Sequence, residues 1–327
     1  MNKSTKDKIS LVLPSWNEEE TIPAFYEELS KTMDKMNMVQ FELIFINDGS
    51  TDNTIKIIRE LALKDDRVRY INFSRGFGKE AGMLAGLEAA TGDYITVMDV
   101  DLQEPPYLIE EMYNTLKEDA DLDCVALRSN NHKSYGFLRK FLTGCYYKVI
   151  TSLSDVEMVH GARDCRLMTR QMLNSVLELR ESSRYIKGLF SFVGYNTKWL
   201  EFEEPDRVAG ESYFNIRKLF KYAFGAIVSF STKPLLISAA FGILFCFIAF
   251  VMIIFIITKT LIWGDPVGGW PSLACIMFLC SGLQMFFLGV IGEYISKIYI
   301  EAKKRPIYIV KETEKDLKTI KKAKVKE

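Results

Sequence analysis

The chain has 327 residues, 48% of them hydrophobic, and its 42 Lys and Arg residues balance its 42 Asp and Glu residues. A chain this apolar is not intrinsically disordered, and a net charge of zero gives no bulk attraction to nucleic acid. The averages conceal three regions. Residues 1–233 have the composition of a soluble domain, residues 234–292 are almost free of charge, and residues 293–327 are rich in lysine. This order predicts a soluble domain, a membrane anchor and a basic tail.

The first 130 residues alternate short β-rich runs with helical patterns, which is typical of an α/β domain with a parallel sheet. We predict strands at residues 9–13, 41–46, 68–73, 94–98 and 123–127. We predict helices at residues 18–36, 51–63, 79–90 and 106–116. Clusters of polar residues follow directly after these strands, and in open α/β sheets ligands bind at that edge.

The acidic run DVDLQ (residues 99–103) directly follows the predicted strand at 94–98. Its carboxylates, Asp99 and Asp101, stand two positions apart, so both can reach one hard cation as the chain leaves the sheet. Mg²⁺ and Mn²⁺ typically take carboxylate ligands and share their remaining positions with water and substrate phosphates. A solvated turn is the alternative interpretation of so short a motif, and its position at a strand end favours the metal site.

Three more clusters follow strands: PSWNEEE (14–20), NDGSTDNT (47–54) and RGFGKE (75–80). In the second, turn formers and helix caps account for most residues, which leaves Asp48 available to accept hydrogen bonds from a base or ribose. In the third, glycines let the backbone approach a ligand closely, and Lys79 adds positive charge near a helix start, where anions bind. This loop is neither GxGxxG nor GxxxxGKS, so it indicates neither a dinucleotide site nor a P-loop.

Two stretches without formal charge, 234–258 and 266–292, each exceed the roughly 20 apolar residues needed to cross a bilayer. A pair of buried core helices is the alternative. The link between them is short, so we predict a transmembrane hairpin. Basic residues precede the first stretch and follow the second, which places the soluble domain and both termini in the cytoplasm. Residues 214–231 mix basic and aromatic residues at helical spacing, which favours an amphipathic helix lying in the membrane interface.

The four clusters, in this order at consecutive strand ends, resemble the GT-A fold family 2 inverting glycosyltransferases. The resemblance is strongest to the branch of dolichol-phosphate mannose synthases and polyprenyl-phosphate (bactoprenol) glucosyltransferases. Later stretches resemble the same branch: GARDCRLMTR (161–170), RYIKGLFSFVGY (184–195), RVAGESYF (207–214) and GEYISKIYIEAKKRPIYIV (292–310). Trp16 stands where the family more often has Tyr, and Asn47 where it often has a second Asp, but Asp48 is in place.

The resemblance implies roles for individual residues. The nucleotide-sugar would be bound by Pro14, Asn17, Glu18, Asp48, Lys79, Asp99 and Asp101, with Asp48 on the uracil or guanine side. The metal, Mg²⁺ or Mn²⁺, would be bound by Asp99, Asp101 and Gln103. Arg128 and Arg207 would meet the acceptor phosphate, and a surface ion pair is the alternative for each. The residues implied to be catalytic are Asp101, Asp164 and Arg207; for Asp164 a role as base and a role in orientation both stay open.

The resemblance further implies a nucleotide-sugar-binding, Rossmann-like GT-A domain with a mostly parallel sheet at 1–213, followed by the interfacial helix. A two-helix transmembrane hairpin at 232–294, with spans at about 234–258 and 268–292, and a cytoplasmic basic tail at 295–327 complete the chain. We expect donor binding to belong to residues 1–213 alone.

The implied reaction moves a hexose from a nucleotide-sugar to membrane-borne polyprenyl phosphate with inversion, and UDP-glucose is the favoured donor. Assembly into a homo-oligomer stays open. The alternatives are a processive polysaccharide synthase, which would be expected to carry QxxRW and more spans, a non-catalytic membrane subunit with the same fold, and a nucleotidyltransferase.

Overall fold

The computed structural model describes residues 6–129, 161–182, 184–203, 233–263 and 269–316, together with residues 159 and 205. The chain divides into two compact units. The first comprises Met1–Tyr147, Val156–Asn215 and Arg305–Glu327, and the second comprises Lys148–Asp155 and Ile216–Lys304. The stretch that the sequence analysis assigned to a separate basic tail at 295–327 therefore divides between the two units, and its larger part belongs with the catalytic domain.

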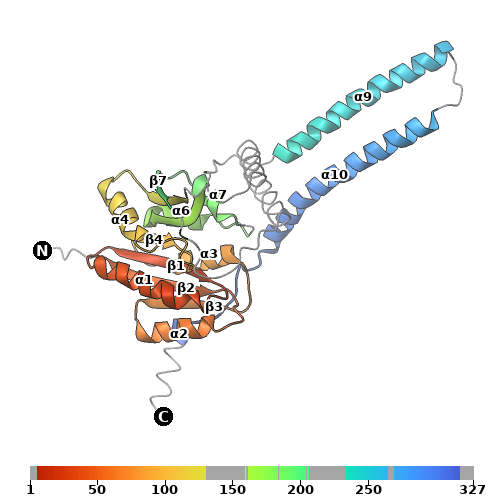
Figure 1. Cartoon of the computed structure of the whole chain (residues 1–327). Coiled ribbons are helices and arrows are strands. Elements are labelled where there is room, and N and C mark those ends of the chain that lie inside the picture. The colour runs from red at the N-terminus through yellow and green to blue at the C-terminus, as the bar shows by residue number, and fades with distance from the viewer. Residues whose placement is uncertain are drawn as a thin grey trace. The chain divides into compact units, whose positions relative to one another are not determined.

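A single sheet forms the centre of the first unit, and the described residues contribute eight strands to it (Figure 1). Their spatial order is β7 (Thr197–Phe202), β5 (Cys124–Ser129), β6 (Ala162–Thr169), β4 (Tyr94–Val97), β1 (Lys8–Ser15), β2 (Gln40–Asn47), β3 (Val68–Phe73) and β8 (Val310–Thr313). Most neighbouring pairs are parallel; β6 runs antiparallel to β4 and β5, and β8 runs antiparallel to β3. The predicted α/β class with a mostly parallel sheet is confirmed.

Helices cover both faces of this sheet. One core cluster packs α1 (Thr21–Lys35), α2 (Thr54–Lys64) and α4 (Leu108–Glu118) against one face. The other packs α3 (Lys79–Ala89), α6 (Arg170–Glu178) and α7 (Ile186–Phe192) against the opposite face. Strand side chains alternate between the two: Leu11 and Leu13 belong to the first cluster and Val12 to the second. Central strands are therefore apolar on both faces, and each fully buried Leu or Val contributes roughly 1.5–3 kcal/mol.

The five predicted strands are all present, and the strand at 68–73 has the predicted bounds. Three helices begin later than predicted, and one of them, α2, begins at Thr54 rather than residue 51. Helix α1 begins at Thr21 rather than residue 18, and before it the backbone N–H groups of Glu18 and Glu19 bond the side chains of Thr54 and Asp52. Helix α4 begins at Leu108, after two consecutive prolines.

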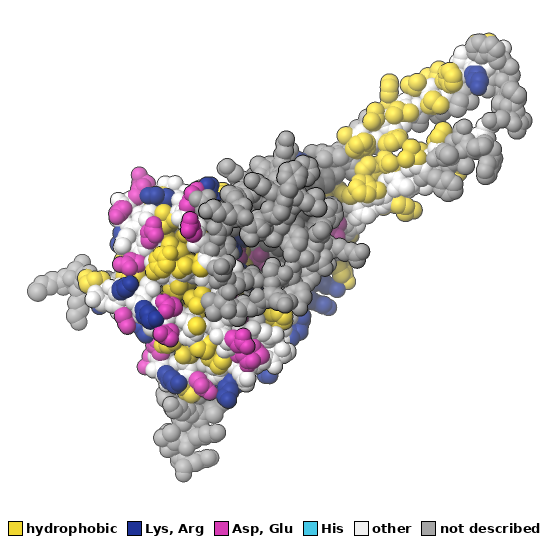
Figure 2. Space-filling view, viewed as in Figure 1, with side chains coloured by type: hydrophobic (Ala, Val, Ile, Leu, Met, Phe, Trp, Pro, Cys, Tyr) yellow, Lys and Arg dark blue, Asp and Glu magenta, His cyan; other side chains and the backbone are white. Residues whose placement is uncertain are grey.

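The described part of the second unit consists of two long helices, α9 (Lys233–Trp263) and α10 (Trp270–Lys303). They have 31 and 34 residues, so at roughly 1.5 Å per residue both are longer than a bilayer core of about 30 Å. Large apolar side chains are exposed along them, including Phe247 and Phe286 (Figure 2). Among the described residues, Leu279–Lys303 is long and apolar enough to cross a membrane. One candidate span is thus supported, the second span stays a prediction, and the interfacial helix at 214–231 lies outside the described residues.

Candidate active site

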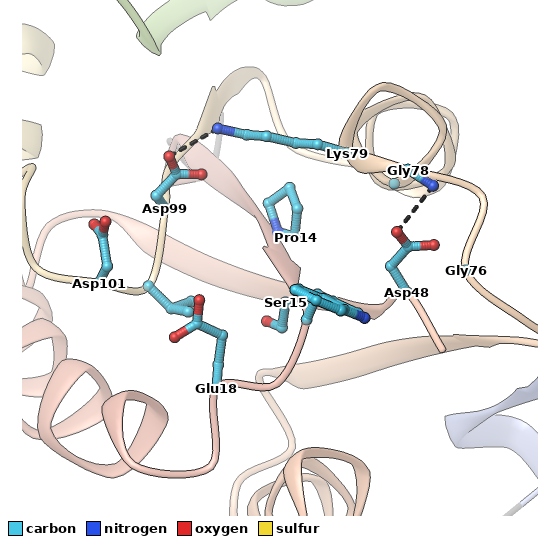
Figure 3. A pocket seen from close by; sticks show the side chains of 12 residues that line it. Pro14, Ser15, Glu18, Asp48, Gly76, Gly78, Lys79, Asp99 and Asp101 are labelled. Atoms are coloured by element: carbon cyan, nitrogen blue, oxygen red, sulfur yellow. Dashed lines mark hydrogen bonds and ion pairs between the residues drawn. The ribbon is translucent and has the colours of Figure 1, made fainter. Parts of the chain in front are cut away.

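A cavity of about 540 Å³ lies where β1, β2 and β4 end (Figure 3). Strand β1 pairs with β2 on one side and β4 on the other, so the strand order reverses at this point, which is where open α/β sheets bind ligands. All four predicted clusters contribute to the lining: Pro14, Ser15, Trp16, Glu18, Asp48, Gly76, Gly78, Lys79, Gly82, Asp99, Val100 and Asp101. In Figure 3, Glu18, Asp99 and Asp101 lie at one end of the cavity and Asp48 at the other.

Asn17 connects the loop after β1 to the loop after β2. Its side-chain Oδ1 accepts a hydrogen bond from the N–H of Thr51 at 2.9 Å, and its own N–H donates to Ser50 Oγ at 3.0 Å. Its φ of 55° lies in the left-handed region, which asparagine tolerates better than most residues. Asn17 is not among the residues that line the cavity. In the structure it holds the two loops together and does not face the pocket.

Asp48 connects the loop after β2 to the start of α3. Its carboxylate accepts hydrogen bonds from the backbone N–H groups of Phe77 at 2.6 Å and Gly78 at 2.9 Å. The loops pack backbone against backbone at Gly49, whose φ is +68°. Any side chain at this position would clash, since its Cβ would lie 2.4 Å from the backbone nitrogen of Gly76. An ionised carboxylate offers about four lone-pair positions, so Asp48 can still accept a hydrogen bond from a ligand.

Lys79 bridges two carboxylates that come from different strands. Its Nζ lies 2.7 Å from Asp99 and 2.8 Å from Asp164, and Lys187 lies 3.5 Å from the other oxygen of Asp164. The register that pairs Val97 of β4 with Arg166 of β6, continued beyond the strand end, brings Asp164 opposite Asp99. The predicted catalytic Asp164 and the predicted ligand Asp99 are thus brought together by one antiparallel pairing.

Neighbouring charges shift the pKa values of Lys79 and Asp164. Burial disfavours the charge on Lys79, but the carboxylates of Asp99 and Asp164 outweigh that effect and raise its pKa. Burial acts against Asp164 as well, yet Lys187 and Lys79 hold its pKa well below its usual range. Asp164 therefore stays ionised and Lys79 stays protonated throughout the physiological range of pH.

Asp101 sits in a tight turn after β4. Its Oδ1 accepts a hydrogen bond from the backbone N–H of Gln103 at 3.1 Å, and Leu102 between them has a φ of 60°. Leucine is unfavourable in that left-handed region, which costs of order 1 kcal/mol and is typical of functional turns. Gln103 is not among the lining residues, so of the predicted metal ligands Asp99 and Asp101 are those that face the cavity.

Negative charge accumulates at this end of the cavity. Burial raises the pKa of Glu18, and the charges of Asp101 and Asp99 raise it further. In the described part of the chain, no group of three or more His, Cys, Asp or Glu side chains is placed to hold a metal. Two facing carboxylates nevertheless fit a hard dication that takes the rest of its coordination from ligand oxygens, as Mg²⁺ does in phosphate sites. The donor set thus suits a metal that binds together with a diphosphate.

The sequence analysis missed two residues of the site. Glu104 is 2% exposed, and its Oε2 lies 3.5 Å from the backbone nitrogen of Asp99. Burial, together with the negative charge of Asp99, raises the pKa of Glu104 to about 8. Lys187 donates to the carbonyl oxygen of Ala162 at 3.0 Å as well as pairing with Asp164. Glu104 directly follows DVDLQ, and Lys187 lies within RYIKGLFSFVGY. Both residues could therefore have been proposed from their place in or beside motifs already identified.

The predicted phosphate-binding arginines lie apart from this cavity or outside the described residues. Arg128, on β5, forms an ion pair with Glu201 of β7 and is not among the lining residues. This is the surface ion pair that the sequence left open as the alternative. Arg207 lies outside the described residues.

The sequence profile described as Glycosyl transferase family 2 matches residues 10–177. A bactoprenol glucosyl transferase of Shigella phage SfV is 40% identical over 308 residues, which cover 93% of this chain and 98% of that protein. A prophage bactoprenol glucosyl transferase homolog of Escherichia coli is 39% identical over 312 residues, which cover 94% and 100%. Among solved structures, the glucosyl-3-phosphoglycerate synthase of Mycobacterium tuberculosis in complex with Mn²⁺ and uridine-diphosphate-glucose is 19% identical, with 68% of this chain and 77% of that chain covered and a TM-score of 0.44.

The profile spans the strands that build the cavity, and the relatives match almost the whole chain. The chain belongs to glycosyl transferase family 2.

Proposed function

We propose that this protein is a membrane-bound inverting glucosyltransferase that moves glucose from a nucleotide-sugar, UDP-glucose being favoured, to polyprenyl phosphate. The observation that carries the proposal is the Lys79 bridge between Asp99 and Asp164, at the acidic end of a cavity lined by all four motif clusters. The bactoprenol glucosyl transferase names of the relatives from Shigella phage SfV and Escherichia coli support glucose as the sugar and bactoprenol, a polyprenyl lipid, as the carrier of the acceptor phosphate.

The two ends of the cavity suggest how the donor lies in it. The nucleobase would lie toward Asp48, whose remaining lone pairs can accept from a base N–H, with Trp16 available as an exposed aromatic surface on the lining. The diphosphate would lie toward Asp99 and Asp101. Asp101 and Asp99 would hold Mg²⁺ or Mn²⁺ there, and the metal would supply positive charge that stabilises the leaving nucleoside diphosphate.

Lys79 is placed to act on the same leaving group. Its protonated amine lies between the donor-side carboxylate Asp99 and the carboxylate Asp164 on the neighbouring strand. A fixed cation at this position stabilises negative charge as it develops on the diphosphate oxygen, without reorganising during the reaction. This role extends the donor-binding role that the sequence assigned to Lys79.

The acceptor needs little activation, because a lipid phosphate is already anionic near neutral pH. Its oxygen attacks the anomeric carbon, the bond to the diphosphate breaks, and direct displacement converts an α-linked donor into a β-linked product. A general base works best with a pKa near the operating pH, whereas the pKa of Asp164 lies well below its usual range. We therefore assign Asp164 an orienting role, in which it holds Lys79 and Lys187 in place.

The acceptor must present its phosphate at the bilayer surface, because burying that charge in hydrocarbon costs too much. Helix α10 provides one candidate span, and we propose that α9 provides a second, with both termini in the cytoplasm. Arg207 stays proposed, by resemblance, as a contact of the acceptor phosphate; Arg128 would first have to leave Glu201. Reporter fusions at Glu327 and at Gly264 test the topology, because a hairpin gives opposite signals and matching signals contradict it.

The function is tested by incubating membranes that contain the full chain with a panel of nucleotide-sugars and polyprenyl phosphate. We expect glucose from UDP-glucose to enter the lipid fraction, with release of UDP. A polysaccharide synthase would instead form polymer, a nucleotidyltransferase would form pyrophosphate, and a non-catalytic subunit would turn over no donor. Lipid-linked product from a different nucleotide-sugar alone would contradict the assignment of glucose and leave the reaction type in place.

A further inference from the structure

The chain returns from α10 to the catalytic domain as a short strap, which we define as residues 307–314. Its strand β8 pairs antiparallel with β3, matching Ile71 with Thr313 and Asn72 with Glu312. The contact continues past the ladder, because the N–H of Ser74 donates to the carbonyl oxygen of Ile309 at 3.0 Å. Ser74 directly precedes Arg75–Gly78, the loop whose glycines line the donor cavity.

An aromatic stack links this strap to that loop. The ring of Tyr308 stacks on Phe73 at a centroid distance of 5.0 Å, and Phe73 meets Phe77 edge to face at 5.7 Å. The guanidinium of Arg75 lies 4.2 Å from the centroid of the Phe77 ring. Phe77 is therefore held on one side by the stack and, through its backbone N–H, on the other by Asp48.

Tyr308 also reaches the helix that the loop begins. Its hydroxyl donates a hydrogen bond to Glu88 on α3, and Tyr308 packs with Phe77 and Ala89 against the core cluster beneath α3. Because α3 starts at Lys79, the same residue braces both the loop and the helix that carries the bridging lysine.

The far end of the strap is fixed by ion pairs that do not touch the cavity. Arg59 Nε lies 3.0 Å from Glu312, which also accepts from the hydroxyl of Tyr70. Arg69 Nε lies 3.2 Å from Glu314, which is 8% exposed. The strap is therefore attached to the sheet by ion pairs at its Glu314 end, which we call the fastening end. At its other end Tyr308 contacts the loop and α3.

We infer that Tyr308 is a positioning residue of the donor site: through the stack with Phe73 and Phe77 it holds the Arg75–Gly78 loop in the geometry that binds the nucleoside diphosphate. Residues 305–316 follow both long helices in the sequence but belong to the first unit. The donor site is therefore complete only when this C-terminal segment has docked on the sheet. This replaces the expectation that donor binding belongs to residues 1–213 alone. The inference goes beyond the proposed function and needs only that the cavity binds a nucleoside diphosphate.

The first test needs no ligand. In detergent-solubilised full-length protein, hydrogen exchange of the Phe77 and Gly78 amides is compared between the natural chain, Tyr308→Ala and Tyr308→Phe. An aromatic pair contributes enough to accelerate local opening by about threefold to tenfold when it is lost. We expect that acceleration in Tyr308→Ala and not in Tyr308→Phe, which keeps the ring. The matched control is Glu314→Gln, which keeps the size of a side chain that does not touch the aromatic stack and should leave both amides within about twofold of the natural rate.

The second test measures affinity for UDP in the presence of Mn²⁺ by calorimetry on the same four proteins. Tyr308→Ala should weaken binding by about threefold to tenfold, while Tyr308→Phe and Glu314→Gln bind within about twofold of the natural chain. A folded Tyr308→Ala protein with unchanged exchange and unchanged affinity overturns the inference. If the natural chain binds no UDP, the proposed donor is wrong, and the exchange experiment still decides the role of Tyr308.

Tyr308→Leu repeats both tests if Tyr308→Ala does not fold, since it fills much of the space without a ring. If neither variant folds, exchange of the natural chain in mild denaturant decides the matter. Phe77 and Gly78 should then open together with Val310 and Thr313, and opening of the loop amides independently of the strap would contradict the coupling.

Discussion

Two clusters of charged side chains in the catalytic domain differ in how completely their charges are matched. Around Glu42, which is 4% exposed, Ser10 donates at 2.6 Å, the N–H of Thr91 at 2.9 Å and Arg69 at 2.7 Å. Burial would raise the pKa of Glu42, but these bonds lower it to about 2. Each of these donors bonds the carboxylate directly, and Arg69 also bonds Glu314 and the carbonyl oxygen of Ala89, so the charges are matched within the protein and we call this the closed cluster.

The cavity cluster shows the opposite pattern. Burial and neighbouring carboxylates raise the pKa values of Glu18 and Glu104, and Lys79 is shared between Asp99 and Asp164. Among the described residues that line the cavity, Lys79 brings positive charge and Glu18, Asp48, Asp99 and Asp101 bring carboxylates, and such an excess of acidic groups favours a bound cation. The difference teaches that matched buried charges hold elements together, whereas an excess of one sign at a strand edge indicates a binding site.

The largest effect should follow from removing one of the carboxylates that line the cavity. Asp101→Ala should lower glucose transfer by at least about 10²–10³-fold while the protein folds and inserts, because the metal that stabilises the leaving diphosphate loses a ligand. The assay uses purified protein at saturating Mg²⁺ or Mn²⁺, with Asp34→Ala on the exposed side of α1 as the control. Near-normal turnover of Asp101→Ala would defeat the metal assignment.

Disrupting the closed cluster should instead affect stability and spare catalysis. Glu42→Gln should lower the free energy of unfolding at pH 7 by about 3 kcal/mol, from the difference between the folded and unfolded pKa values. Since the folded pKa is the lower one, this contribution is present above about pH 4.5 and is lost as the pH falls toward 2.

Denaturant titration of the solubilised protein at several pH values measures the effect of Glu42→Gln. The control is Glu27→Gln, an exposed i,i+4 partner of Lys31, which should change stability by less than about 1 kcal/mol. Equal stability of Glu42→Gln and Glu27→Gln would show that the charge of Glu42 contributes nothing to the free energy of unfolding.

A smaller effect is expected from the second lysine of the cavity. Lys187→Met should lower kcat by about tenfold and leave the KM for nucleotide-sugar within about twofold, because Asp164 loses one cation while Lys79 stays in place. Lys198→Met, at an exposed position of β7, is the matched control. An unchanged kcat in a folded Lys187→Met protein would show that the ion pair between Lys187 and Asp164 does not contribute to catalysis.

The sequence predicted the donor side of the site well because its information is local. Each cluster lies directly after its strand, and parallel strands bring those ends to one edge, so Asp48, Lys79, Asp99 and Asp101 were expected together. Their convergence on one cavity is what the structure adds. It also shows that Asn17 clamps loops rather than lining that cavity.

The rest depends on pairing between distant segments. The proximity of Asp164 to Asp99 follows from the antiparallel register of β6 with β4, and no local pattern sets that register. The burial of Glu104 depends on what packs around it, and the pairing of Arg128 with Glu201 depends on β7 lying beside β5. Strand β8 is only four residues long and follows two long helices, so its composition alone predicted a basic tail.

The claim that the carboxylates lining the cavity form a metal-dependent diphosphate site is tested most directly by one calorimetric titration. UDP is titrated into the full-length protein in saturating Mn²⁺, then in EDTA, and the pair is repeated with Asp101→Ala. We predict binding in Mn²⁺ that weakens at least about tenfold in EDTA, and no such metal dependence in Asp101→Ala. Equal affinity of the natural chain for UDP with and without the metal would contradict this account.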